Sequence, residues 1–186
     1  MRRPFRKCIV AAFAATVMFS LPDTALAQDR AGELLEELAA SESAAQAERL
    51  EKALYMEWSK SGSAAMDLLL KRGRDALEVN ETDAAIGHLT ALTDHAPQFA
   101  EGWHALALAY YQVEMFGPAM DALEHVLALN PVHFGALRGV AAIHDQLGND
   151  ALAYEAYAKV LELRPFDEEV TGALERLAGK VQGISI

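Results

Sequence analysis

Three prolines at a constant step most restrict how this chain of 186 residues can fold. Pro97, Pro131 and Pro165 lie 34 residues apart twice in succession, and each follows an apolar stretch with helical spacing. Because proline has no N–H and a fixed φ, it ends the preceding helix and suits a turn into the next one. Neither helix of such a short unit has enough apolar area to form a core alone, so the period predicts stacked helical hairpins.

Small residues recur with the same period and indicate where the helices touch. Glycine or alanine occupies two places in three consecutive units, at Gly73, Ala107, Ala141 and at Ala85, Ala119, Ala153. A large side chain at either place would hold paired helices apart. Within residues 101–131 the spacing resembles that of the tetratricopeptide repeat, a 34-residue helix–turn–helix unit, at Trp103, Leu106, Ala107, Tyr110, Ala119, Leu123, Val126 and Pro131.

The resemblance implies an all-α fold, a right-handed α-solenoid of about three such units within residues 64–165. We expect the units at 66–97, 98–131 and 132–165, an N-terminal helical hairpin at 28–63, a C-terminal capping helix at 166–180 and a tail at 181–186. The hairpin departs from the repeat because Glu51 stands where alanine is usual. We therefore interpret it as a degenerate unit that caps the array at its amino-terminal end.

Residues 1–27 predict a secretory signal peptide. They begin with four basic residues, continue with an apolar run from Cys8 to Leu21 and end in Ala25-Leu26-Ala27. The run of 14 residues is shorter than the roughly 20 that a membrane-spanning helix needs. We expect cleavage after Ala27, a periplasmic or secreted mature protein and no stable membrane insertion after cleavage.

Removal of this segment leaves a strongly acidic chain without cysteine. The segment holds four of the 16 Lys and Arg and one of the 27 Asp and Glu, which leaves 12 against 26 and a formal charge of −14. Such a surface repels nucleic acid and anionic membranes, so we expect neither as a partner. The mature chain can form no disulfide, and its stability must come from packing.

The sequence offers little that resembles a catalytic or metal site. Its six histidines, at 88, 95, 104, 125, 133 and 144, form no His-x-x-x-His pair. His88 and His95 come nearest to a ligand spacing, and neither a phosphate-binding glycine loop nor a Gly-x-Ser-x-Gly motif is present. We expect no enzyme activity, no cofactor and no metal, and a dispersed hydrolase or metal site is the minority hypothesis.

The resemblance implies that function lies on the concave surface, which the first helix of each unit lines. The candidate partner-binding residues are Arg74, Leu77, His104, Leu108, Tyr111, Gln112, Arg138 and Asp145. Leu108 and Tyr111 offer apolar anchors, the arginines can pair with a carboxylate, and His104 can add pH dependence. The competing interpretation is that each is an ordinary half-exposed helix residue.

Tetratricopeptide domains that bind chaperones hold a carboxy-terminal carboxylate with lysines and asparagines at defined places. Those places are occupied here by Leu70, Arg74, Ala105, Gly135 and Gly139, so this clamp is absent. The chain also resembles small exported bacterial proteins of the same repeat, in EWSKSGSAAMDLLLKRG and NPVHFGALRG. We expect a non-enzymatic adaptor of the bacterial envelope that holds a peptide or partner helix in the groove. The alternative is an accessory subunit of an envelope or cell-wall enzyme complex.

Overall fold

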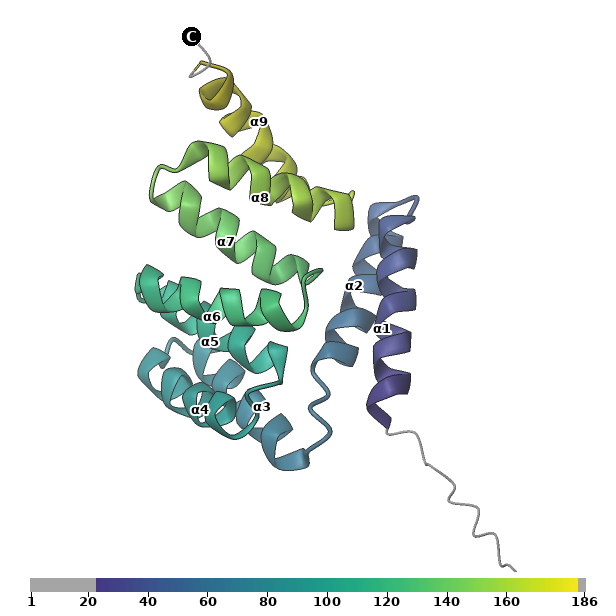
Figure 1. Cartoon of the computed structure of the whole chain (residues 1–186), viewed down its shortest axis with the longest axis vertical. Helices are drawn as coiled ribbons and strands as arrows, with labels where there is room; N and C mark the ends of the chain where they lie inside the picture. The colour runs from purple at the N-terminus through teal and green to yellow at the C-terminus, as the bar shows by residue number, and fades with distance from the viewer. Residues whose placement is uncertain (1–22, 184–186) are drawn as a thin grey trace, which may run out of the picture.

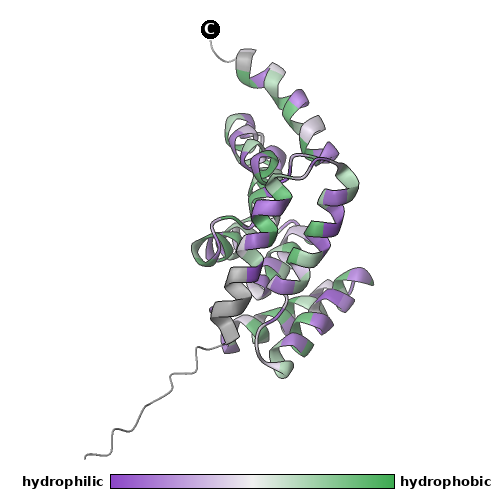
Figure 2. Cartoon of the chain, turned by 90° about the vertical axis from the view of Figure 1, so that its right-hand side faces the viewer, coloured by the Kyte–Doolittle hydropathy of each residue, from purple (hydrophilic) through white to green (hydrophobic). Residues whose placement is uncertain are grey.

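The computed structural model describes residues 23–183, which form nine α-helices and no β-strand (Figure 1). The helices are α1 (Asp23–Ala39), α2 (Ala44–Trp58), α3 (Ala64–Glu78), α4 (Thr82–His95), α5 (Ala100–Gln112), α6 (Phe116–Leu129), α7 (Phe134–Gln146), α8 (Asp150–Leu163) and α9 (Glu168–Gly183). Hydrophobic and hydrophilic residues are interspersed along each helix (Figure 2), as expected where one face of a helix is buried. The prediction of an all-α solenoid is confirmed.

Three helix pairs form the array: α3 with α4, α5 with α6, and α7 with α8. The small residues lie where each pair meets. A Cβ on Gly73 would lie 2.4 Å from Cγ of Leu89, so only glycine permits this approach of α3 to α4. Ala85, Ala119 and Ala153 are completely buried on the second helices, as the period predicts.

The turns inside the three units share one backbone conformation. Asn80, Glu114 and Gly148 lie 34 residues apart and have φ values of 60°, 57° and 74°. This left-handed region suits glycine and asparagine, and it strains glutamate. The turn therefore repeats with the helices, although the second unit has a residue that fits it poorly.

Three helix ends can be compared with the expected segments. Helix α1 contains residues 23–27 of the predicted signal peptide, and residues 1–22 lie outside the described part of the chain, so cleavage after Ala27 stays a prediction. Pro118 is the third residue of α6 and lies in the first turn, where N–H groups have no partner within the helix. Helix α9 continues to Gly183, so residues 181–183 are not part of a loose tail; residues 184–186 lie outside the description.

From its place in the sequence, we expected the N-terminal hairpin to cover the first unit. It packs against the third unit instead. In Figure 1, α1 and α2 stand beside the array and run along its long axis. Leu38 and Leu54 belong to the same buried core as Phe134 and Val160 of the third unit. Arg72 of α3 is exposed and does not support this hairpin.

An ion pair explains the unusual Glu51. The guanidinium of Arg164, which follows α8, donates to both carboxylate oxygens of Glu51, each at 2.7 Å. Arg164 also pairs with Asp167 at 2.9 Å and lies over the ring of Phe134. Alanine at position 51 would serve a repeat that stacks on α3, whereas glutamate serves a hairpin that docks on the third unit.

The C-terminal helix covers the end of the array as predicted. Val170 and Leu177 of α9 are completely buried in the core that α8 and the hairpin share. No helix between residues 23 and 183 has both the length and the apolar character that crossing a bilayer requires.

Candidate functional site

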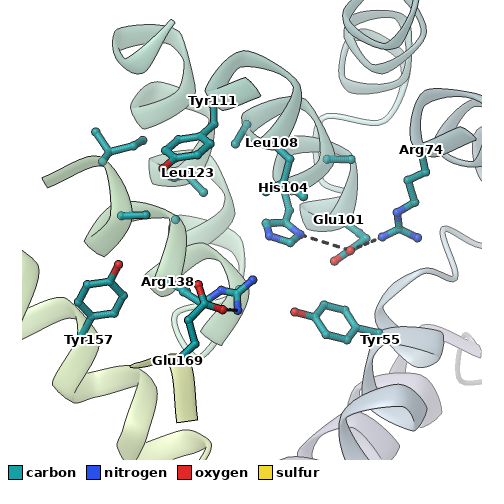
Figure 3. Close-up of a pocket in the computed structure, with 16 residues that line it drawn as sticks. Tyr55, Arg74, Glu101, His104, Leu108, Tyr111, Leu123, Arg138, Tyr157 and Glu169 are labelled. Atoms are coloured by element: carbon teal, nitrogen blue, oxygen red, sulfur yellow. Dashed lines mark hydrogen bonds and ion pairs between the residues drawn. The ribbon is translucent and has the colours of Figure 1, made fainter. Parts of the chain in front are cut away.

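A pocket of about 470 Å³ lies on the face formed by the first helices of the units (Figure 3). Residues of α5 and α7 make most of its wall. The remaining wall comes from Tyr55 of α2, Arg74 of α3, Leu123 of α6, Tyr157 of α8 and Glu169 of α9. Because α2 flanks the pocket on one side and α8 and α9 flank it on the other, the groove is bounded within its own chain (Figure 3).

The structure brings together five of the eight predicted partner-binding residues. The pocket is lined by Arg74, His104, Leu108, Tyr111 and Arg138. The other three serve the fold. Leu77 packs against the core of α3, α4 and α5, the amide of Gln112 donates to Asn80 Oδ1 at 2.7 Å, and Asp145 pairs with Arg176 of α9.

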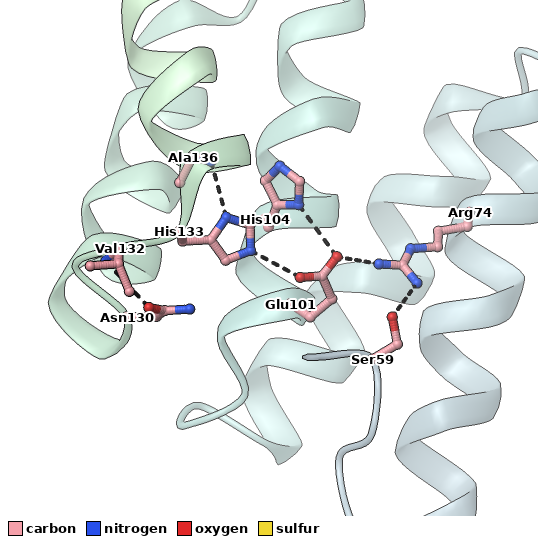
Figure 4. A network of polar contacts seen from close by, with 8 residues as sticks. All are labelled: Ser59, Arg74, Glu101, His104, Asn130, Val132, His133 and Ala136. Carbon is pink, nitrogen blue, oxygen red and sulfur yellow. Dashed lines mark hydrogen bonds and ion pairs between the residues drawn. The ribbon is translucent and has the colours of Figure 1, made fainter. Parts of the chain in front are cut away.

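A buried carboxylate forms the polar end of the pocket (Figure 4). Glu101 is 1% exposed and accepts hydrogen bonds from three side chains. Arg74 donates to its Oε1, and His104 Nδ1 lies 3.4 Å from the same oxygen. Nε2 of His133 lies 3.0 Å from Oε2. One carboxylate thus joins α3, α5 and the start of α7.

The contacts of His133 fix which ring nitrogen carries the proton. The backbone N–H of Ala136 donates to His133 Nδ1 at 3.1 Å, where the imidazole caps α7. Nδ1 must therefore have a free lone pair, and Nε2 carries the hydrogen that it donates to Glu101. The ring also stacks on Trp58 of α2, with 4.4 Å between centroids. Burial lowers the pKa of His133, so the imidazole is neutral at neutral pH.

The network keeps the carboxylate charged. Burial alone would raise the pKa of Glu101, but the hydrogen bonds from His104 and His133 outweigh it and hold that pKa well below its ordinary value. Arg74, which also donates to Ser59 Oγ at 3.0 Å, supplies the compensating positive charge. Arg74 is therefore already engaged and is a poor candidate for pairing with a guest carboxylate, contrary to our expectation.

Comparisons with known proteins agree with this architecture. The family model of the tetratricopeptide repeat matches residues 100–133 and 140–167. A TPR repeat-containing protein of Rhizobium etli is 35% identical over 130 residues, which cover 70% of this chain and 64% of that protein. This chain is a tetratricopeptide-repeat protein. It spans less than two thirds of the length of that relative.

Solved tetratricopeptide structures share the fold. The first TPR domain of Spaghetti (RPAP3), bound to the HSP90 peptide SRMEEVD, has a TM-score of 0.62 at 25% identity, covering 64% of this chain and 95% of that one. The crystal structure of MamA has a TM-score of 0.59 at 22% identity, covering 72% and 83%. The tetratricopeptide-repeat fold is that of a protein-interaction module.

The buried cluster of this tetratricopeptide array has the composition of a metal site but not its bonding. The candidate ligand atoms of Glu101, His104 and His133 lie within 4.8 Å of one another. A metal ion on Nε2 of His133 would move the proton to Nδ1, where it would face the N–H of Ala136. Arg74 would also compete for the carboxylate. The contacts favour an ion-pair centre over a metal site.

Several residues of the site were not predicted from the sequence. Glu101 was not among the predicted residues, although Glu101 and His104 form a Glu-x-x-His pair that places both side chains on one helix face. That spacing was the available signal. Tyr157 lies on α8, the second helix of the third repeat. Tyr55 and Glu169 lie outside the repeats, and only the docking of α2 and α9 brings them to the pocket.

Proposed function

We propose that this protein is a non-enzymatic adaptor that holds a peptide or partner helix in the pocket of its tetratricopeptide array. One observation carries the proposal: Leu108, in the middle of α5, is 46% exposed at the pocket wall beside Tyr111. A leucine that projects from the inner helix layer has no partner in the core and gives a guest an apolar anchor. The charged groups at the other end of the pocket can set the orientation of the guest.

Site-specific photocrosslinking tests the pocket as the binding surface. A photoreactive phenylalanine analogue replaces Leu108 in one variant and Leu152 in a control, because Leu152 of α8 is 50% exposed and does not line the pocket. We expect a crosslinked partner from Leu108 and none from Leu152. The same partner captured from both positions, or from Leu152 alone, would place binding elsewhere on the protein.

We further propose that the adaptor works in the bacterial envelope after export. The basic start, the apolar run and the Ala25-Leu26-Ala27 ending support export. Amino-terminal sequencing of the protein purified from the periplasm tests this proposal, and the expected first residue is Gln28. An intact amino terminus in the cytosolic fraction would contradict it. If the protein serves a cell-wall enzyme complex, it should also co-sediment with peptidoglycan.

A further inference from the structure

The second arginine of the pocket is held by a contact that a guest can replace. Arg138 Nη1 donates to Glu169 Oε2 at 3.2 Å, which joins α7 to α9 across the pocket wall. The side chains of Arg138 and Glu169 are 45% and 81% exposed. Ion pairs this open to water contribute at most about 1 kcal/mol, so Glu169 can turn into solvent at little cost. Glu101 cannot do the same, because it is buried.

A hydroxyl group supplies a second donor beside Arg138. Figure 3 shows Tyr55 and Arg138 pointing toward the same part of the pocket. The ring of Tyr55 is fixed edge-on against Phe134 and Trp58. Among the described residues, none forms a hydrogen bond with its hydroxyl group. Burial, together with the charge of Glu101, raises the pKa of Tyr55 to about 12, so the hydroxyl keeps its proton at neutral pH.

Apart from His104 and the tyrosine hydroxyl groups, the rest of the wall is apolar. It is formed by Leu108, Tyr111, Leu123, Ala142, Ile143 and Tyr157. Arg74 is neutralised by Glu101, so turning Glu169 away leaves one uncompensated positive charge in the pocket, at Arg138. One positive charge next to an apolar wall fits one carboxylate attached to an apolar group.

We propose that this pocket binds the carboxy-terminal residue of a partner chain, with its carboxylate on Arg138 and the Tyr55 hydroxyl in place of Glu169 and its apolar side chain against Leu108 and Tyr157. The end of a chain fits better than its middle, because α2 flanks the pocket on one side and α8 and α9 on the other (Figure 3). The inference rests on the proposed adaptor function and names the part of the partner that is recognised.

This arrangement differs from the clamp of chaperone-binding tetratricopeptide domains. The clamp places hold Leu70, Arg74, Ala105, Gly135 and Gly139, and Arg74 is bound to Glu101. Arg138 lies one helical turn after Gly135, whereas Tyr55 and Glu169 come from helices outside the three repeats. The hairpin and the capping helix thus build a site that the repeats alone do not contain.

A pair of small probes tests the recognised chemistry. N-acetylphenylalanine carries a carboxylate next to an apolar side chain, and N-acetylphenylalaninamide differs from it only in lacking the charge. Each is titrated into the purified protein, and binding is followed by NMR at the methyl groups of Leu108 and Ile143. We expect the acid to bind at least about tenfold more tightly than the amide, since hydrogen bonds to a charged group are the stronger ones. Equal binding of acid and amide would overturn the inference.

Three variants assign the contacts. Arg138→Gln should abolish the preference for the acid, Tyr55→Phe should weaken binding of the acid several-fold, and Glu169→Gln should strengthen it because the internal competitor is gone. Arg176→Gln is the matched control, because Arg176 pairs with Asp145 between the same two helices and does not line the pocket. A control that loses acid binding as Arg138→Gln does would show that α9 docking, and not the carboxylate contact, is responsible.

Peptides then distinguish the chain end from other carboxylates. One pentapeptide ends in phenylalanine with a free carboxylate, and a second carries phenylalanine beside an internal aspartate and ends in an amide. We expect only the first to bind. Binding of the second peptide with equal affinity, or of 3-phenylpropionate more tightly than any peptide, would overturn the assignment to a chain end. A partner crosslinked at Leu108 would in those cases still support the adaptor function.

Discussion

Glu101 is the residue on which the inner surface depends. It lies at the centre of contacts from α3, α5 and the cap of α7. A buried charge of this kind is tolerated only while its partners remain, because the cost of removing it from water is several kcal/mol. Glu101 therefore positions Arg74 and His133. It does not contact the guest in the proposed site at Arg138 and Tyr55.

Removal of this charge should destabilise the protein strongly. Glu101→Gln keeps the shape of the side chain but leaves the Arg74 guanidinium without its counter-charge, so we expect a loss of about 3 kcal/mol in the free energy of unfolding. Urea unfolding followed by circular dichroism measures it. Glu169→Gln, which removes an exposed pair, should change the free energy by less than about 0.5 kcal/mol. Equal effects of the two variants would contradict the central role of Glu101.

The same carboxylate should make stability depend on pH in the acid range. Its pKa in the folded protein is well below its ordinary value, so it binds its proton more weakly in the folded state than in the unfolded state. The resulting stabilisation is complete above the unfolded-state pKa of about 4.3 and is lost as the pH falls toward the folded-state pKa. Urea midpoints between pH 7 and pH 3 should fall more steeply for the wild type than for Glu101→Gln. Parallel curves would exclude this carboxylate as the cause.

The helices and their contacts could be predicted from the sequence because they depend on local residues that repeat. Gly73 must be small for α3 to reach Leu89, and the same restriction produces Ala107 and Ala141 at the next two steps. The turns follow the same period, and Asn80 and Gly148 are recognisable as left-handed residues. Glu114 is not, since nothing about glutamate indicates this conformation.

Relief of strain in that turn should stabilise the second repeat. Glu114 has a φ of 57°, which costs a residue with a side chain roughly 1–2 kcal/mol. Glycine removes the strain but adds flexibility to the unfolded chain, so Glu114→Gly should raise the free energy of unfolding by about 0.5–1 kcal/mol. Asn80→Gly is the control and should gain less, because asparagine tolerates this conformation. Urea unfolding measures both, and a loss of stability in Glu114→Gly would contradict the strain.

At the scale of the whole molecule, the position of the hairpin could not be predicted. Glu51 and Arg164 are 113 residues apart, and a single glutamate in an alanine place indicates only that a repeat is degenerate. The pocket depends on this docking, because Tyr55 reaches it from α2 and Glu169 from α9. The predicted residues that line the pocket all come from the first helices of the repeats, whereas Tyr55 and Glu169 of the two terminal elements could not be predicted.

Weakening the dock should release the hairpin while the array stays folded. Trp58→Ala removes the ring that stacks on His133 and packs against Phe134, which should cost about 2–3 kcal/mol for a half-buried tryptophan. Hydrogen exchange should then show lost protection in α1 and α2, with α3–α6 protected. Trp103→Ala is the control, since Trp103 lies in α5 and should affect the second repeat first. Uniform loss of protection in both variants would indicate that the hairpin and the array unfold as one unit.

The dock between Glu51 and Arg164 also limits how such a protein can evolve. Helix α2 leads into the first repeat and yet binds beside the end of the third, so its length matches a stack of three. Duplication of an internal repeat would carry Arg164 one step beyond the reach of Glu51, and deletion would bring it one step short. Open arrays grow or shrink by whole repeats. In this array, either change would break the ion pair between Glu51 and Arg164, so the number of repeats is fixed at three.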